Sequence, residues 1–257
     1  MSPRRGLALA LAALALVGLA AVPRPARAFG DEGAFDPRPL LTGQARFEGL
    51  RATAPAAWSA ELRRRTSAPA REAPEPVRAD SDQLLAEPFA WWVGDEPLAP
   101  LTSPELDHLR RFFAQGGLLL VDDADPRGGA FGRDARRELA RVLPDAAPIA
   151  LGPEHVLFRS FYLLRRAVGR VEGPAKLDAI VRGGDVQVVF SAHDLAGALA
   201  RTPSGVAAFP VEPGGDSQRE QATRLAVNLA MYALCSNYKD DQVHAPFLMR
   251  RRGRATP

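Results

Sequence analysis

Carboxylates, a serine and a histidine follow two aliphatic runs of the sequence. "GGLLLVDDADPRGG" ends its apolar run at Asp122 and Asp123, and "VQVVFSAHDL" ends its run at Ser191, His193 and Asp194. Carboxylates with a histidine in reach can bind a hard cation or position a water molecule for hydrolysis. The same short polar side chains also cap the turns and helices that follow strands. From the residues alone, both interpretations stay open.

Three further polar residues lie elsewhere in the chain. His155 follows a proline-bearing turn in "GPEHVLF", so we expect a partly exposed ring that is either solvated or a proton carrier. Arg224 and Asn228 share one face of the helix predicted for "SQREQATRLAVNLAMYALC". Apolar residues surround Asn228, and a buried amide must find hydrogen-bond partners. We therefore expect Asn228 to tie this helix to a neighbouring loop.

Several common kinds of site are not indicated by the sequence. It contains no HxxxH or CxxC spacing, which disfavours a zinc site. It contains no GxSxG or GxCxG, the strained turn that exposes a nucleophile. The single cysteine, Cys235, closes a predicted helix and is interpreted as a small core residue. The sequence therefore assigns no metal site and no cofactor, and without a recognisable nucleophile or metal motif it favours a protein that is not an enzyme.

The elements around the first aspartate pair read as strand, helix, strand over residues 89–121. "FAWWV" is a β-prone aromatic run, and "LLLV" is typical of a strand buried on both faces of a parallel sheet. Between them, Ser103 is a predicted N-cap, followed by Pro104 and Glu105, and Gly116-Gly117 ends the helix. If the strand over residues 186–190 joins the same sheet in parallel, both polar clusters lie at one sheet edge. That carboxyl edge is where open α/β sheets bind ligands.

The remaining chain fits one α/β domain. A helix is predicted over residues 134–144, a strand over 186–190 after Gly183-Gly184, and a long helix over 217–235. Residues 68–82 read as a surface connection, and residues 200–217 as a long irregular insertion.

The first 28 residues have the pattern of a secretory signal peptide. Arginines precede an apolar run, and "ARA" offers small residues for cleavage between Ala28 and Phe29. The general secretory route is the default, and the paired arginines leave twin-arginine export open. The segment carries four of the arginines, so a net charge of +3 becomes −1 for the rest of the chain. This balance gives no electrostatic case for nucleic-acid binding, and no transmembrane helix is expected in the mature chain.

Five stretches together carry a family resemblance over about residues 38–252. They are "LTSPELDHLRRFFAQGGLLLVDD", "HVLFRSFYLL", "VVFSAHDLAGAL", "GGDSQREQATRLAVNLAMYAL" and "YKDDQVHAPFLMRRR". In this order and spacing the chain resembles the bacterial family of domain of unknown function 4159. The resemblance implies a fold similar to class I glutamine amidotransferases, a flavodoxin-like three-layer α/β sandwich with a mostly parallel central sheet. The family's function is not established, and its members tend to be exported or membrane-attached.

The resemblance also marks a set of recurrent polar and aromatic positions. They are Asp122, Asp123, His155, Phe158, Tyr162, Ser191, Asp194, Arg219, Glu220, Arg224, Asn228, Tyr232, Tyr238, Lys239 and His244. His193 stands where many relatives have asparagine. Asp122-Asp123 stands where an amidotransferase would hold its cysteine nucleophile, so the resemblance does not extend to glutaminase chemistry.

These observations give one layout and three functional hypotheses. The layout is a signal peptide (1–28), a lead-in (29–37), a single α/β domain (38–240) and a C-terminal strap with a basic tail (241–257). The leading hypothesis is an exported, periplasmic or extracellular domain that binds a small ligand or an envelope protein partner without catalysis. The alternative is a hydrolase or metal-dependent enzyme that uses Asp122, Asp123 and Asp194 with a histidine. The third is a structural assembly component.

Overall fold

The computed structural model describes residues 33–252, with side chains through residue 236. The predicted signal peptide, with its cleavage between Ala28 and Phe29, lies outside the described residues, as do the side chains of Tyr238, Lys239 and His244.

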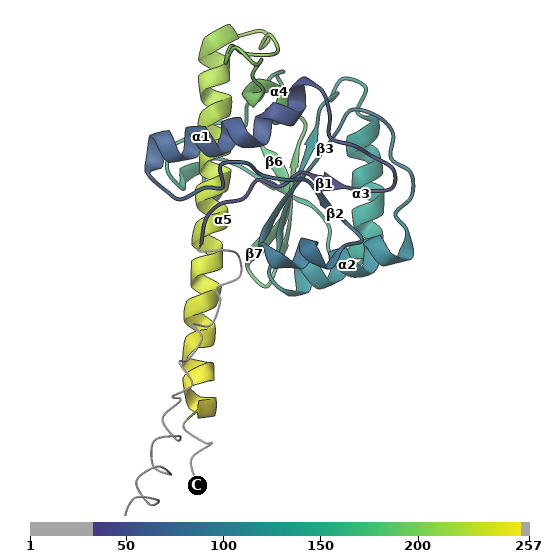
Figure 1. Cartoon of the computed structure of the whole chain (residues 1–257), viewed down its shortest axis with the longest axis vertical. Helices are drawn as coiled ribbons and strands as arrows, with labels where there is room; N and C mark the ends of the chain where they lie inside the picture. Colours follow the sequence, from purple (N-terminus) through teal and green to yellow (C-terminus); the bar gives the residue numbers. More distant parts are fainter. Residues whose placement is uncertain (1–32, 253–257) are drawn as a thin grey trace, which may run out of the picture.

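A five-stranded sheet forms the centre of the domain, in the order β3-β4-β7-β6-β5 (Figure 1). The strands are β3 (Phe89–Gly94), β4 (Leu118–Asp123), β5 (Ile149–Leu151), β6 (Leu177–Arg182) and β7 (Asp185–Ser191). β3, β4 and β7 are parallel neighbours, whereas β6 is antiparallel to β5 and to β7. The predicted strand–helix–strand unit over residues 89–121 is confirmed, and the sheet is mostly but not wholly parallel.

Strand β6 is one of the elements that the sequence did not indicate. It pairs with β7 through a tight hairpin in which Arg182 lies opposite Asp185. The two connecting residues, Gly183 and Gly184, have φ values of 62° and 96°. Two consecutive positive φ angles are what a two-residue hairpin requires, and glycine adopts them without a steric penalty.

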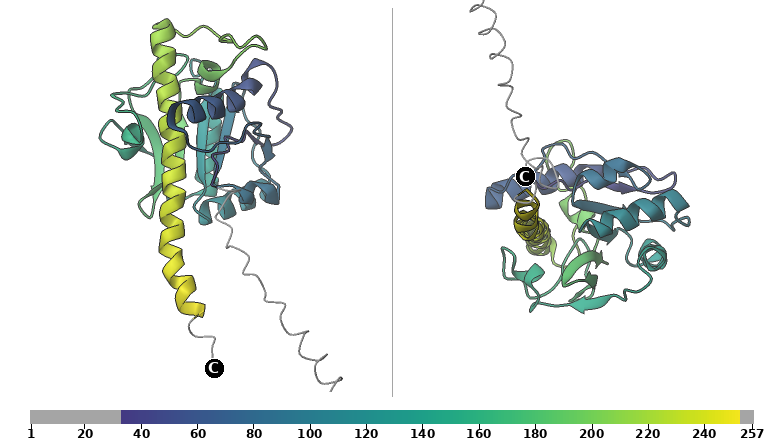
Figure 2. Two further views of the ribbon diagram at one scale, coloured as in Figure 1. Left: turned by 60° about the vertical axis from the view of Figure 1, so that its left-hand side comes forward. Right: turned by 90° about the horizontal axis from the view of Figure 1, so that it is seen from below.

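Helices cover both faces of the sheet (Figure 2). α2 (Ser103–Ala114) and α3 (Ala130–Val142) pack on one face, while α1 (Ala54–Thr66), α4 (Leu195–Leu199) and α5 (Gly215–Arg252) pack on the other. Short 3₁₀ helices η1 (Leu50–Thr53), η2 (Asp82–Ala86) and η3 (Val156–Arg159) complete the fold. α5 continues beyond the rest of the domain and occupies residues 241–252, where a strap was expected.

Side chains of the strands contribute to the hydrophobic core on both faces of the sheet. Because successive strand side chains point to opposite faces, Trp91 packs towards α1 and α5, and Trp92 packs towards α2 and α3. The Trp58 indole of α1 meets the Trp91 ring edge-on at 4.8 Å and donates to the carbonyl of Ala226 in α5. These buried aromatics join α1, the sheet and α5 in one cluster.

Two local predictions were wrong. The N-cap of α2 is Thr102 rather than Ser103: its side chain and Glu105 form a reciprocal capping box, which leaves Ser103 as the first helical residue. Cys235 is exposed rather than a small core residue, because it lies on the face of α5 that turns away from the sheet.

A two-stranded parallel extension stands beside β3. β1 (Leu40–Leu41) pairs with β2 (Val77–Arg78), which lies inside the segment expected to be a plain surface connection. β1 meets β3 at a single bridge, Pro39 to Trp91. Among the described residues, no helix is both long and apolar enough to cross a membrane.

Candidate functional site

The two polar strand ends meet at the carboxyl edge of the sheet, as the sequence predicts. Asp122 of β4 is in register with Ser191 of β7, and the Asp194 amide donates to the carbonyl of Asp123 at 3.1 Å. All of these residues are buried: Asp122 and Asp194 have no solvent-exposed surface, and Asp123 and Ser191 are each 4% exposed. The edge therefore concentrates acidic side chains inside the protein rather than on its surface.

Asp122 binds the start of helix α4. Its two carboxylate oxygens accept hydrogen bonds from the backbone amides of Leu195 (3.0 Å) and Ala196 (2.8 Å). Burial and, to a smaller extent, the charge of Asp194 raise the pKa of Asp122 to about 7, although these amides and Ser191 oppose the rise. Asp122 is thus a buried cap of α4 that carries a fractional charge near neutral pH.

Asp123 binds the start of helix α3 on the opposite face of the sheet. Its Oδ1 accepts from the Asp125 amide at 3.0 Å, and its Oδ2 accepts from the Gly132 amide, in the first turn of α3, at 3.2 Å. Burial raises the pKa of Asp123, and these amide donors oppose the rise. Since neighbouring strand residues point to opposite faces, the aspartate pair fixes one helix on each side of the sheet.

Asp194 is the centre of an ion-pair cluster. It adopts a left-handed conformation (φ 51°) at the N-cap of α4 and accepts from the Gly197 amide. Arg51 donates to both of its oxygens, at 3.1 and 2.9 Å, and Arg170 donates to Oδ2. The Arg51 guanidinium also lies 4.6 Å from the centre of the Phe209 ring. Asp194 therefore joins η1, α4 and the loop that carries Arg170.

His193 does not face the sheet edge. Its Nε2 lies 2.9 Å from the carbonyl of Pro174, which can only accept, so Nε2 carries the proton. The ring is buried, and burial lowers the pKa of His193, which keeps the imidazole neutral. Gly173 packs directly on it, since a Cβ there would lie 2.9 Å from Nε2. His193 was a candidate for the ligand-binding edge, and in the structure the chain at Gly173–Pro174 covers its ring.

His155, Arg224 and Asn228 lie away from the aspartates. The His155 ring lies 6.1 Å from that of Tyr232, whose hydroxyl accepts from the Val186 amide at the beginning of β7, the opposite end from Ser191. Burial lowers the pKa of His155, and its Nδ1 accepts from the Leu157 amide. Arg224 pairs with Glu220. These three residues do not belong to the carboxyl edge.

Glu220 is the centre of a second, half-exposed ion-pair cluster. Arg65 of α1 donates to both of its carboxylate oxygens, at 2.8 and 2.7 Å. These bonds lower the pKa of Glu220 to about 2. Arg224 lies 5.1 Å from the centre of the Tyr162 ring. The cluster fastens α1 to α5.

Asn228 has the structural role predicted for it. Its Oδ1 accepts from the amides of Phe161 and Tyr162, and its Nδ2 donates to the carbonyl of Tyr162 at 2.8 Å. Asn228→Leu should lower the free energy of unfolding by about 2 to 3 kcal/mol, because three backbone groups lose their partner. Urea unfolding checks this, and a loss below about 0.5 kcal/mol would contradict the role.

An open cleft lies beside the buried acids at the same edge. It has a volume of about 690 Å³ and runs between residues 40–51 and residues 92–99, with Ala124, Phe131 and Phe209 completing its lining. This volume is within the range of small-molecule sites, roughly 300–1,000 Å³. Arg51, whose side chain is 20% exposed, lines the cleft while its guanidinium is held by Asp194. Asp194 thus holds in place the arginine that lines the cleft.

The sequence did not single out the residues that line this cleft. Arg51 comes from the short 3₁₀ helix η1, and Asp95 and Phe209 come from loops; none of these segments has a hydrophobic period. The sequence did contain one signal that Asp122 and Asp123 do not form a site together. Consecutive strand residues face opposite sides of a sheet, so their carboxylates cannot bind the same ligand.

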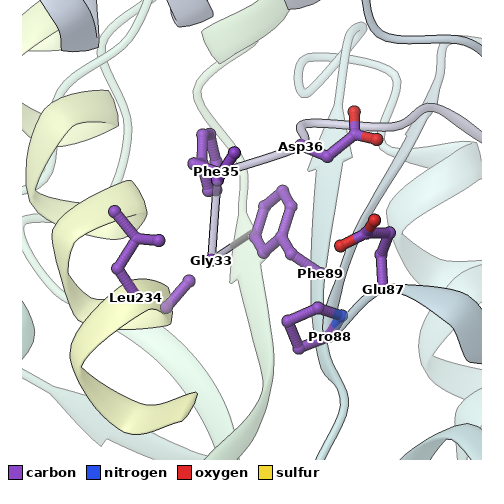
Figure 3. Close-up of a pocket in the computed structure, with 9 residues that line it drawn as sticks. Gly33, Phe35, Asp36, Glu87, Pro88, Phe89 and Leu234 are labelled. Carbon is purple, nitrogen blue, oxygen red and sulfur yellow. The ribbon is translucent and has the colours of Figure 1, made fainter. Parts of the chain in front are cut away.

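A second cavity near the opposite, amino end of β3 is too small for a ligand (Figure 3). It has a volume of about 20 Å³ and is lined by Phe35, Asp36, Glu87, Phe89 and Leu234 among others. This is about the space that one water molecule needs.

The buried carboxylates at the carboxyl edge cap helices and pair with arginines. The carboxylate oxygens are directed at helix amides and guanidinium groups inside the protein. In the described part of the chain, no three His, Cys, Asp or Glu side chains are grouped so as to hold a metal ion.

A family model described as "Domain of unknown function (DUF4159)" matches residues 40–234. No curated protein matches the sequence.

Proposed function

We propose that this chain, which belongs to the DUF4159 family, is an exported binding domain that holds its ligand in the carboxyl-edge cleft. One observation carries this proposal: Asp122, Asp123 and Asp194 are buried as helix caps and ion-pair partners, while an open cleft lies beside them. The cleft offers aromatic and aliphatic walls with a few fixed charges, the usual composition of a ligand site.

A finer fold relationship is part of the same proposal. We infer that the domain is related to the class I glutamine amidotransferase-like, flavodoxin-like folds. An open sheet with parallel neighbours β3, β4 and β7 and helices on both faces supports this. In such sheets the carboxyl edge is the ligand-binding edge, and the cleft lies there.

Export to the periplasm or the cell exterior is the second part of the proposal. It is supported by the signal-peptide pattern of residues 1–28. Cell fractionation followed by N-terminal sequencing tests it: the mature chain should begin at Phe29. A cytoplasmic chain that retains residues 1–28 would contradict export while leaving the binding proposal intact.

Ligand binding is tested with two matched leucine variants. Leu50 lines the cleft and is 43% exposed, whereas Leu163 is 85% exposed and lies outside it. A fragment library screened by thermal shift should contain compounds that raise the Tm of the wild-type protein by about 3 °C when present at roughly ten times their Kd. Leu50→Glu should abolish these shifts, because it places a charge in the cleft, and Leu163→Glu should preserve them. Equal loss in both variants, or no shift with any compound, would contradict the proposal.

A further inference from the structure

The cleft opens because strands β1 and β3 separate. Their pairing consists of the Pro39–Trp91 bridge, supported by the Trp91 amide, which donates to the carbonyl of Arg38 at 2.8 Å. Beyond that bridge, both chain segments continue as opposite sides of the cleft, Leu40 to Gly43 on one side and Trp92 to Asp95 on the other. The cleft is therefore bounded by a strand edge and not only by side chains.

The hydrogen-bond alternation of β3 shows which backbone groups face the cleft. The amides of Leu118 and Ala124 donate to the carbonyls of Pro88 and Gly94, so even-numbered β3 residues bond to β4. Trp91, an odd-numbered residue, bonds to the β1 side. In a parallel ladder these directions alternate, so the N–H and C=O of Val93 point into the cleft, past the last bridge to β1.

Two apolar walls flank this edge. Phe209 lies on the α1 and α4 side, and Phe131 of α3 lies on the α2 side. The Phe131 ring reaches the strand because residue 94 is glycine: a Cβ at Gly94 would lie 2.2 Å from it. An exposed strand edge with one apolar wall on each face is the arrangement that receives a peptide strand, whose successive side chains point to opposite sides.

We propose that the cleft binds an extended peptide segment of a partner protein, which adds a strand along the outward edge of β3 at Val93. Alternate side chains of this segment contact Phe209 and Phe131. The inference rests on the proposed binding function and specifies the chemistry of the ligand: peptide backbone groups pair with Val93, and apolar side chains fill the two walls. Backbone pairing supplies affinity, and the two walls supply sequence preference.

The test begins with a phage-displayed library of random heptapeptides selected on the full mature chain. Selected sequences are synthesised with blocked ends, and their Kd is measured by fluorescence anisotropy. We expect apolar residues at alternate positions. Residue-resolved amide exchange should show slower exchange at Val93 when peptide is bound. A selection that enriches no peptide, or peptides that leave the Val93 amide exchange unchanged, would overturn the proposal.

N-methylation of single peptide amides tests the backbone pairing without changing the protein. Methylation of an amide that faces β3 should weaken binding at least about tenfold, because it removes a donor and blocks the approach of the strand. Methylation of the adjacent amide, which points away from β3, should weaken binding much less. Equal effects at all positions would overturn the proposal.

Val93→Pro removes one donor from the strand edge and keeps the β4 ladder, because the Val93 N–H does not face β4. Proline is tolerated on strand edges in this orientation. It should weaken peptide binding about tenfold, whereas Val206→Pro, an exposed control outside the cleft, should not. If Val93→Pro does not fold, the N-methyl series decides.

The fragment screen separates this inference from the proposed function. Compounds that shift the Tm in a Leu50-dependent way, without any selected peptide, would leave the cleft as a small-molecule site and overturn the peptide proposal alone. Failure of both compounds and peptides would overturn both.

Discussion

Replacing Asp194 with alanine is expected to lower the free energy of unfolding by about 3 to 5 kcal/mol at pH 7, the usual cost of removing one partner from a buried ion pair. Asp194 is fully buried and neutralises both Arg51 and Arg170, whose side chains are 20% exposed. Its loss leaves two guanidinium groups without their shared carboxylate. It also removes the cap that binds the Gly197 amide.

Two further variants separate the contributions of Asp194. Asp194→Asn also removes the charge shared by Arg51 and Arg170, but it tolerates the left-handed conformation and can still accept from Gly197, so it should lose about 1 kcal/mol less than Asp194→Ala. Asp107→Ala removes an exposed aspartate paired with Arg110 on α2 and should change stability by less than about 0.5 kcal/mol. Urea unfolding measures all three. An Asp194→Ala variant as stable as Asp107→Ala would show that the cluster does not support the fold.

The second large effect is a pH dependence that originates from Asp122. Its pKa is raised to about 7 in the folded protein and is about 3.9 in an unfolded chain. Between these values the folded state binds more protons than the unfolded state, so stability is highest at low pH and falls as pH rises towards 7. From pH 5 to pH 8, this group should remove about 2 to 3 kcal/mol of stability.

Asp122→Asn isolates this contribution from those of the other acids. The variant cannot ionise, so its stability should fall by about 2 to 3 kcal/mol less than that of the wild type between pH 5 and pH 8. It should also be less stable than the wild type at pH 5, because an amide –NH₂ faces a backbone N–H of α4 where a carboxyl oxygen accepted. Parallel pH profiles for the two proteins would contradict the assignment.

The position of the acids was predictable from the sequence, but their role was not. Aliphatic runs followed by polar residues indicate where strands end, and the parallel pairing of β4 with β7 brought Asp122 beside Ser191 as expected. The role depends on which groups meet each carboxylate. Arg51 lies 143 residues from Asp194 in the chain, in the short 3₁₀ helix η1 without a periodic pattern, so no local signal connects them.

The short strands β1 and β2 could not be predicted from the local sequence either. β1 and β2 have two residues each, and each directly follows prolines, where composition favours a loop. They are strands because residues 38–41 meet β3 on one side and β2 on the other. The cleft depends on this long-range contact and on the point at which it ends, neither of which a local pattern contains.

The most direct test of the account is the location of bound fragments on the intact mature chain, mapped by backbone amide NMR shifts. If the carboxyl-edge cleft is the binding site and the strand-end acids are its support, the shifted amides will cluster in residues 42–51 and 93–98 and at Phe209. Shifts that cluster elsewhere, with these residues unchanged, would contradict the account.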